Sequence, residues 1–269
     1  MNYTNKVVVI TGATSGIGEA CAAVFGAAGA KLVITGRNAQ KLEATAAKLQ
    51  AMNLTVLPIL ADAGSEADNK RMAEEALARF GRIDILINNA GISMRALLKD
   101  ATTEVIKKVM DINLMGVVFC TRYALASLIK SKGTIVGVSS IAGYRGLPGR
   151  SGYSASKFAL QGFLESIRTE LIDDGVHVMW VCPGFTTSNI RHAALDKNAE
   201  AHGETSMDED KMMSADECAK HILNAIAKKK RTLVLTFTGK RTVFMNRFFP
   251  AWADKLVYRF FFKGGKLIK

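Results

Sequence analysis

The chain has 269 residues, 49% of them hydrophobic, and a formal net charge of +12. This length suits one large α/β domain, and the hydrophobic content excludes an intrinsically disordered protein. The first residues lead straight into a strand without a secretory pattern, and no apolar run reaches the ~18–20 residues of a membrane-spanning helix. Because the four cysteines form no Cys-x-x-Cys pair and the four histidines show no ligand spacing, we expect a cytoplasmic protein without a metal site.

Strand and helix patterns alternate along the chain. Apolar runs predict strands at 6–10, 31–35, 55–60, 84–87, 133–139, 176–181 and 232–237. Helical patterns occupy 17–28, 38–52, 65–80, 104–131, 152–173 and 216–228, with Asn38 and Ser65 as expected N-caps. The alternation predicts an α/β fold with one doubly wound, Rossmann-type parallel sheet of about seven strands and helices on both faces.

A glycine-rich segment, Thr11-Gly12-Ala13-Thr14-Ser15-Gly16-Ile17-Gly18, joins the first predicted strand to the first helix. Glycines let the backbone turn tightly and approach a pyrophosphate, and the helix N-terminus offers free N–H groups. The spacing Gly-x-x-x-Gly-x-Gly differs from the commoner Gly-x-Gly-x-x-Gly. Such a loop also fits an ordinary turn, but its place between a strand and a helix favours dinucleotide binding.

Tyr153 and Lys157 lie four residues apart in a predicted helix, so both side chains are expected on one face, one turn apart. An ammonium beside a phenol favours the phenolate and lowers a pKa that is ordinarily about 10. The pair predicts Tyr153 as a general acid/base. Taken alone, Tyr-x-x-x-Lys fits a surface tyrosine beside a solvated lysine better, and the other motifs of the chain are what favour the catalytic interpretation.

The set of motifs resembles the short-chain dehydrogenase/reductase family. The matches lie in the family's order over about residues 6–190: Thr11-Gly-x-x-x-Gly-x-Gly18, Asn88-Asn89-Ala90-Gly91, Asn113, Ser139-Ser140, Tyr153-x-x-x-Lys157 and Pro183-Gly184. The chain has no internal repeat and no low-complexity linker, so we expect 1–269 to be one dinucleotide-binding catalytic domain, with 238–269 a basic aromatic C-terminal extension that the shared motifs do not explain. The resemblance covers the motifs before this extension. It also implies an oxidoreductase that reduces a carbonyl to an alcohol or catalyses the reverse, and a homodimer or homotetramer built through the long helices.

The resemblance carries roles over to matching residues. Ser140 would donate a hydrogen bond to the substrate carbonyl, Tyr153 would protonate the alkoxide, and Lys157 would lower the Tyr153 pKa and hold the nicotinamide ribose. Asn113 would hold a water that links Lys157 to solvent. The implied cofactor contacts are Gly12, Ser15, Gly16, Ile17, Gly18, Arg37, Asp62, Asn89, Ala90, Gly91, Tyr153, Lys157, Pro183, Gly184 and Thr186. Read alone, Ser139 and Ser140 fit a strand end, Asn113 a helix kink, Asp62 a turn, and Pro183-Gly184 an exit turn.

The cofactor is expected to be NADP(H). An NAD site usually places a carboxylate after the second strand, but Gly36 stands there and Arg37 follows. A guanidinium can grip a 2′-phosphate that a carboxylate would repel. Against this, Ser15 stands where many NADP-using relatives have a basic residue, and Arg37 could simply be solvated.

The substrate is expected to be a hydrophobic carbonyl compound, such as a lipid, a steroid or a 3-oxoacyl derivative. The family shapes its pocket at the positions of Ser93, Met94, Tyr144, Leu147, Phe185 and Ile190, which are mostly apolar. The same residues also suit ordinary loop packing. The polar stretch 198–210 fits either a substrate lid or a solvated loop.

The positive charge is concentrated near the C-terminus. Residues 228–269 hold 12 Lys and Arg against one acid, Asp254, together with nine of the 20 aromatic residues. Basic and aromatic residues together suit an anionic membrane surface, here the inner face of a membrane reached from the cytoplasm. The alternatives are aromatic packing over the substrate pocket or at a subunit interface. Without a recognition module we expect no nucleic-acid binding.

Two functions follow from these observations. The first is an NADP(H)-dependent carbonyl reductase or alcohol dehydrogenase. The alternative is a catalytically idle NADP-binding protein that acts through its tail as a membrane or protein adaptor.

Overall fold

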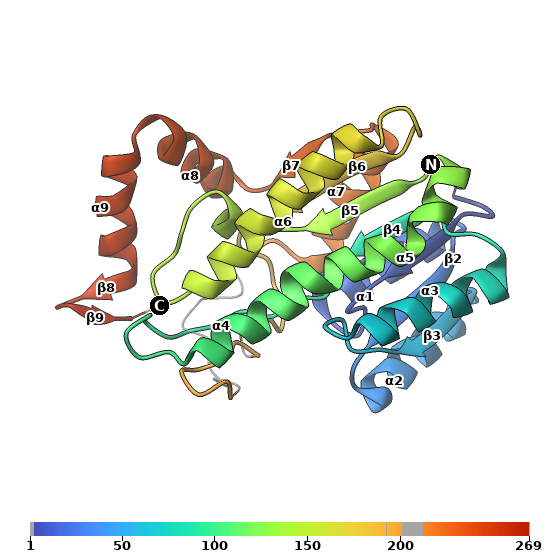
Figure 1. The fold of residues 1–269 in the computed structure, drawn as a ribbon, viewed down its shortest axis with the longest axis horizontal. Coiled ribbons are helices and arrows are strands. Elements are labelled where there is room, and N and C mark those ends of the chain that lie inside the picture. Colours follow the sequence, from blue (N-terminus) through green and yellow to red (C-terminus); the bar gives the residue numbers. More distant parts are fainter. Residues whose placement is uncertain (1–2, 192, 201–211, 269) are drawn as a thin grey trace.

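The computed structural model describes residues 3–191, 193–200 and 212–268 (Figure 1). Seven strands pair in parallel in the order β3-β2-β1-β4-β5-β6-β7. They are β1 (Val7–Ile10), β2 (Lys31–Gly36), β3 (Val56–Leu60), β4 (Ile85–Asn88), β5 (Thr134–Val138), β6 (His177–Cys182) and β7 (Thr232–Val234). The prediction of a Rossmann-type parallel sheet is confirmed.

Helices cover both faces of this sheet, as the alternation predicted. They are α1 (Gly16–Ala27), α2 (Ala39–Ala51), α3 (Glu66–Phe80), α4 (Thr103–Met110), α5 (Gly116–Ser131), α6 (Ser151–Glu170) and α7 (Ala215–Ala227). Side chains alternate along β1: Val8 and Ile10 pack with α1, α2 and α7, whereas Val7 and Val9 pack with α3, α5 and α6. Asn38 caps α2 and Ser65 caps α3, each by accepting a backbone N–H, as predicted.

The long helix predicted over 104–131 is divided in the structure. A π-helical turn, η1 (Asp111–Met115), separates α4 from α5 and contains Asn113. The combined stretch Thr103–Ser131 is long and apolar enough to cross a membrane by length and composition. In the fold, however, α5 packs against α3, β4 and β5 as part of the layer that covers the sheet.

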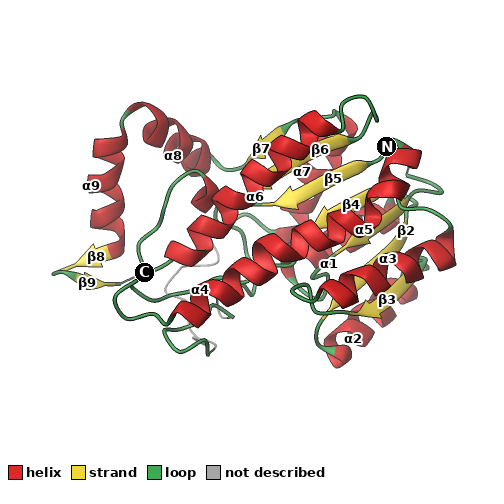
Figure 2. Cartoon of the chain, in the orientation of Figure 1, coloured by secondary structure: helices red, strands yellow, loops and turns green. Residues whose placement is uncertain are grey.

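The C-terminal segment differs from the strand predicted over 232–237. β7 ends at Val234, and the Thr236 side chain accepts the Gly239 N–H at 3.0 Å, which starts a helix instead. The segment continues as α8 (Phe237–Phe248), α9 (Pro250–Phe261) and a short hairpin of β8 (Phe262–Lys263) and β9 (Lys266–Leu267). In Figures 1 and 2 these elements form an arm that extends from the sheet beyond β7.

The strand order reverses beside β1, which lies between β2 and β4. In open parallel sheets, ligands bind at the carboxyl ends of the strands at such a switch point. The glycine-rich loop leaves β1 at this edge, and the segment from Asn89 to Gly91 follows β4 there. The topology therefore brings together motifs that are more than 70 residues apart in the sequence.

Candidate active site

The glycine-rich loop is packed too tightly for side chains at two positions. Gly12 has a φ of +63°, and a Cβ there would stand 2.8 Å from the Ala90 Cα atom. A Cβ at Gly18 would meet the Gly12 carbonyl oxygen and lie 2.5 Å from Asn89 Nδ2. The backbone thus leaves an open cradle at the N-terminus of α1, where free N–H groups and the helix dipole favour phosphate.

Asn89 and Thr11 hold the loop to the end of β4. Asn89 Nδ2 donates to the carbonyl oxygens of Thr11 and Gly12, both at 3.0 Å. Thr11 Oγ1 in turn accepts the backbone N–H groups of Asn89 and Ala90, both at 3.0 Å. These bonds give Asn89 a structural part in the site.

A groove of about 410 Å³ runs along this edge of the sheet. Gly18 lies beneath the loop and does not line it. All the other predicted cofactor residues do: Gly12, Ser15, Gly16, Ile17, Arg37, Asp62, Asn89, Ala90, Gly91, Tyr153, Lys157, Pro183, Gly184 and Thr186. Its size and its line of contacts from Arg37 to Thr186 fit an extended dinucleotide.

Two polar features of the groove also fit such a ligand. The hydroxyl of Thr186 is buried and has no hydrogen-bond partner among the described residues, so a ligand amide could satisfy it. At the other end, Arg37 and Lys41 line the groove beyond β2, and Arg37 is exposed. Asp62, which lines it too, accepts the Gly64 N–H at 2.9 Å and so also makes a turn.

Tyr153 and Lys157 lie on α6 and are both buried. Lys157 Nζ donates to the Val138 carbonyl oxygen at 2.9 Å and stands 5.7 Å from the centroid of the Tyr153 ring. Burial lowers the pKa of the Lys157 ammonium to about 8. The structure therefore brings the two residues to one face, as their spacing predicted.

The prediction was that Lys157 lowers the pKa of Tyr153, but other groups act on this pKa in the structure. Burial raises the pKa of its phenol, and the Ser140 hydrogen bond and the positive charge of Arg150 oppose this rise. The Lys157 amine instead faces the Val138 carbonyl. Arg150, three residues before Tyr153, is therefore the cation that acts on the phenol, and the sequence analysis did not identify it.

Asn113 is fully buried in the π-helical turn. Its Oδ1 accepts the Ile92 N–H at 2.8 Å, and its Nδ2 donates to the Ile92 carbonyl and to Ser156 Oγ, both at 2.9 Å. A Cβ at Gly91 would stand 3.2 Å from this Oδ1 and 3.5 Å from Lys157 Nζ. Asn113 and Lys157 thus flank Gly91, and π-helical turns are frequent at functional sites.

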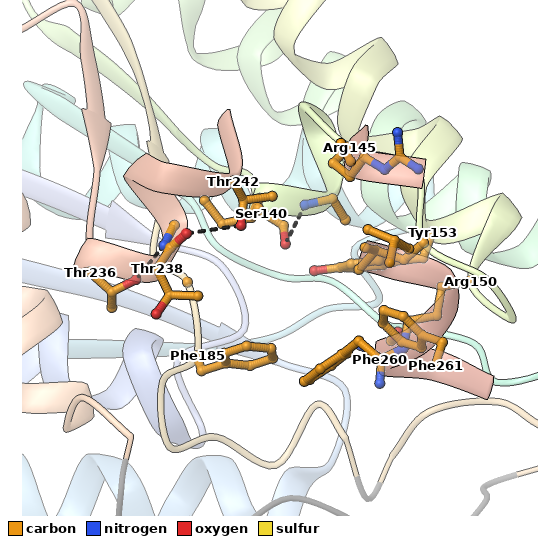
Figure 3. A pocket seen from close by; sticks show the side chains of 18 of the residues that line it. Ser140, Arg145, Arg150, Tyr153, Phe185, Thr236, Thr238, Thr242, Phe260 and Phe261 are labelled. Atoms are coloured by element: carbon orange, nitrogen blue, oxygen red, sulfur yellow. Dashed lines mark hydrogen bonds between the residues drawn. The ribbon is translucent and has the colours of Figure 1, made fainter. Parts of the chain in front are cut away.

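A second cavity, the chamber, has a volume of about 440 Å³ and adjoins the groove (Figure 3). Ser140 and Tyr153 line both cavities, and the Tyr153 hydroxyl points toward Ser140. The far wall comes from the C-terminal arm: Thr236, Thr238, Gly239, Arg241, Thr242, Met245, Ala253, Leu256, Val257, Phe260 and Phe261. The arm therefore covers the chamber, one of the alternatives left open by the sequence.

The expected pocket residues are partly placed at the chamber. Ser93, Leu147, Phe185 and Ile190 line it. Met94 is buried in a cluster with Tyr153 instead, and the Tyr144 hydroxyl accepts the Trp180 Nε1–H at 3.1 Å. Most of the predicted lid, residues 201–210, lies outside the described residues.

Five arginines line the chamber that were not predicted from the sequence: Arg95, Arg145, Arg150, Arg191 and Arg241. They lie on separate segments, and none belongs to a motif. The one available signal was the short spacing from Arg150 to Tyr153, which places both at the start of the same helix.

The four cysteines are free and buried, and burial raises their pKa values, to about 12 for Cys120. Such thiols are poor nucleophiles. The described residues contain no group of three or more His, Cys, Asp or Glu side chains arranged to hold a metal ion.

Comparison with known proteins agrees with this geometry. The family model for short chain dehydrogenases matches residues 6–199. Dehydrogenase/reductase SDR family member 7B of Mus musculus is 40% identical over 255 residues, which cover 91% of this chain and 78% of that protein.

Two solved structures are similar as well. A short-chain dehydrogenase/reductase from Burkholderia phymatum in complex with NAD has a TM-score of 0.84 and 25% identity, covering 92% of this chain and 94% of its own. An alcohol dehydrogenase from Thermococcus sibiricus complexed with 5-hydroxy-NADP has a TM-score of 0.73 and 26% identity, covering 86% and 95%. With its motifs gathered at one edge of a Rossmann-type sheet, the chain belongs to the short-chain dehydrogenase/reductase family of nicotinamide-dependent oxidoreductases.

Proposed function

We propose that the protein is an NADP(H)-dependent oxidoreductase that reduces the carbonyl of a hydrophobic substrate to an alcohol, or catalyses the reverse. The observation that carries this proposal is the shared position of Ser140 and Tyr153, which line both the groove and the chamber. A dinucleotide in the groove and a carbonyl compound in the chamber would meet at these two hydroxyls. An adaptor without activity would need no such junction.

Four residues would carry the reaction. A reduced nicotinamide supplies the hydride when bound. Ser140 Oγ would donate a hydrogen bond to the carbonyl oxygen, and Tyr153 Oη would give its proton to the oxygen as negative charge develops there. Lys157 would hold the ribose hydroxyls, and Asn113 would keep Lys157 in contact with a water through the turn that it fixes. The cofactor residues named above would line the dinucleotide.

Replacement of the phenol tests the catalytic assignment. Tyr153→Phe should abolish NADPH oxidation with a carbonyl substrate while NADPH binding, measured by fluorescence titration, stays within about threefold. Tyr123→Phe, on α5, is the matched control and should keep activity. Turnover by Tyr153→Phe within a few-fold of the wild type would refute the role.

The preference for NADP(H) rests on charge. Arg37 lines the groove without a hydrogen bond or ion pair among the described residues, and Lys41 lies one turn further on. A guanidinium in this position suits a 2′-phosphate. Arg37→Asp should weaken NADPH binding at least about tenfold and favour NADH. Unchanged dissociation constants for both cofactors would remove the assignment.

The substrate class requires a screen. Apolar side chains such as Leu147, Phe185 and Phe260 favour a lipid-like, steroid-like or 3-oxoacyl compound. NADPH oxidation by the full-length protein should be followed with simple ketones, steroids, 3-oxoacyl thioesters and long-chain keto-lipids. Turnover of none of them, together with intact NADPH binding, would favour the adaptor function.

We further propose that the C-terminal extension, 238–269, contacts the inner face of a membrane from the cytoplasm. Its aromatic side chains Phe244, Phe248, Phe249, Trp252 and Tyr258 are all more than half exposed, as is Phe237 just before it. Lys240, Arg247, Lys255 and Arg259 are exposed beside them. This combination suits an anionic lipid surface. Vesicles with anionic lipid should float the full chain but not a chain lacking 240–269, and equal flotation would end the proposal.

We also propose a single catalytic domain that assembles as a homodimer or homotetramer. Met115 at the junction with α5 is 36% exposed, and Phe158 on α6 is 47% exposed, so both could be covered by a second copy. Light scattering of the purified protein should give two or four times the mass of one chain.

A further inference from the structure

The chamber combines an apolar wall with an unusual positive charge. Five arginines line it, and no Asp or Glu among the described residues does. Its apolar side chains include Met245, Leu256, Val257 and Phe260 of the arm. Cations are expensive to hold in such surroundings unless an anion accompanies them.

The positive charge of Arg145 is balanced by an ion pair within the protein. It pairs with Asp254 of α9 at 2.5 Å, and its other terminal nitrogen donates to Asn246 of α8 at 2.9 Å. Arg145 therefore has a structural part, because it ties the arm to the segment before α6. Its charge is already balanced within the protein.

Arg150 has no such ion pair with the described residues. Its guanidinium has no hydrogen bond or ion pair with the described residues and stands 5.8 Å from the centroid of the Phe261 ring. Burial lowers the pKa of Arg150; Tyr153 opposes this shift, and the like charges of Arg95 and Arg191 add to it. Among the described residues, the Arg95 guanidinium donates only to the Ile268 carbonyl, at 3.3 Å. A carboxylate or phosphate between Arg95 and Arg150 would relieve this repulsion.

We propose that the chamber binds an amphiphilic carbonyl compound with an acidic group, a carboxylate or a phosphate, held by Arg95 and Arg150. The apolar part of this compound lies against α8, α9 and Phe185. This inference rests on the proposed function and narrows its substrate class from hydrophobic to acidic and hydrophobic.

The positions of Arg150 and Tyr153 also limit the ligand. Both are at the start of α6, one turn apart, and the charge of Arg150 acts on the phenol. Figure 3 shows Arg150 and Phe261 on one side of Tyr153, with Phe185 and Phe260 below the hydroxyl. The acidic group therefore lies within a few bonds of the reacting carbonyl, rather than at the distant end of a long chain.

Binding to the full-length protein tests the inference without turnover. Calorimetric titration should use dodecyl phosphate, dodecanoate and dodecanol, which share a chain and differ in the head group. Both anions should bind at least about tenfold more tightly than the alcohol, because a charge-assisted hydrogen bond discriminates by this much. The tighter of the two identifies the acidic group as phosphate or carboxylate. Equal binding of all three compounds would overturn the inference.

Variants assign the preference to the chamber. Arg150→Met should weaken anion binding at least about tenfold and leave dodecanol within about twofold, whereas Arg150→Lys should retain part of the preference. Arg122→Met, at an exposed position on α5, is the matched control and should change neither. If Arg150→Met and Arg95→Met both keep the wild-type preference while folded by circular dichroism, the anion binds elsewhere and the inference fails.

Turnover separates this inference from the proposed function. A long-chain keto acid whose carbonyl lies within a few bonds of the carboxylate should have a kcat/KM at least about tenfold above that of its methyl ester, and added salt should reduce this advantage. Turnover of both at equal efficiency would refute the acidic substrate but keep the reductase. Selective binding of the anions without turnover of any carbonyl would keep the acidic site but refute the reductase.

Discussion

Two glycines of the fold differ in the space that they leave for a side chain. Gly18 in α1 has no room, because a Cβ there would enter the Gly12 carbonyl oxygen, whereas Gly162 in α6 is exposed and has no atom within 4 Å of its Cβ position. We predict that Gly18→Ala destabilises the protein by about 1–3 kcal/mol through overpacking. Gly162→Ala should stabilise it by about 0.5–1 kcal/mol, since alanine favours the helix. Urea unfolding of both variants measures the difference, and similar effects would contradict the packing of the loop.

Lys157 makes stability depend on pH in the alkaline range. Its pKa is lowered to about 8 in the folded protein and returns to about 10.4 on unfolding. Between these values the unfolded chain binds the extra proton, so this residue's contribution to stability increases as the pH rises from 8 to 10.4. The free energy of unfolding of the wild type, relative to Lys157→Met, should therefore rise on the order of 2–3 kcal/mol across this window. Lys99→Met, at an exposed site, is the control, and a flat difference for Lys157→Met would contradict the burial of the amine.

Some residues of the candidate site could be predicted from the sequence, and others could not. Tyr153 and Lys157 were singled out by their four-residue spacing and Ser140 by the family resemblance, and all three line the groove. Arg95 and Arg150 were not, because the space that they share is closed by α9, more than 90 residues later. The distance between them in the sequence gives no sign of this cavity.

At the scale of elements, one carboxylate joins the amino ends of two strands. Asp84, just before β4, accepts the Val7 N–H at 3.0 Å and forms ion pairs with Lys6 and Arg82. Burial alone would raise its pKa, but these partners outweigh burial and lower it. Because the folded pKa is lowered, Asp84 stabilises the protein above its unfolded pKa of about 3.9, and this contribution is lost as the pH falls through the folded value.

We therefore predict that Asp84→Asn costs about 1–3 kcal/mol at pH 7 and progressively less under acidic conditions. Asp100→Asn, at an exposed position, should cost nothing measurable. Thermal unfolding between pH 3 and pH 7 measures both. A penalty for Asp84→Asn that does not change with pH would mean that its charge has no part in holding the strands.

The sequence predicted the strands of the sheet more accurately than it predicted the helices and the C-terminal elements. Apolar runs located all seven strands of the parallel sheet, since a strand covered on both faces needs continuous apolar residues, whereas the hairpin of β8 and β9 was not predicted. Asn113 was one candidate for a helix kink in the sequence, but the division of the helix there depends on its tertiary bonds to Ile92 and Ser156, which the sequence does not show. Strand β7 was predicted too long because Thr236 was not recognised as the cap of α8. Pro250 at the start of α9 was an available signal for that helix.

At the scale of the whole molecule, the groove and the chamber, which are the proposed cofactor and substrate sites, draw partly on different stretches of the chain. The groove is built from residues 12–193, whereas one wall of the chamber comes from residues 236–261. We predict that truncation after Leu235 leaves NADPH affinity within about threefold and raises the KM of any substrate at least about tenfold through the lost contacts. Fluorescence titration and steady-state kinetics measure the two effects. A parallel loss of NADPH binding would mean that the arm supports the sheet itself.

Because the arm supplies one wall of the chamber, the stretch of chain that would select the substrate differs from the stretch that would hold the dinucleotide. Substitutions of the side chains of α8 and α9 that line the chamber should change which molecules fit there, while the lining of the groove stays the same. Substrate range could therefore be redesigned in this terminal stretch without rebuilding the dinucleotide site.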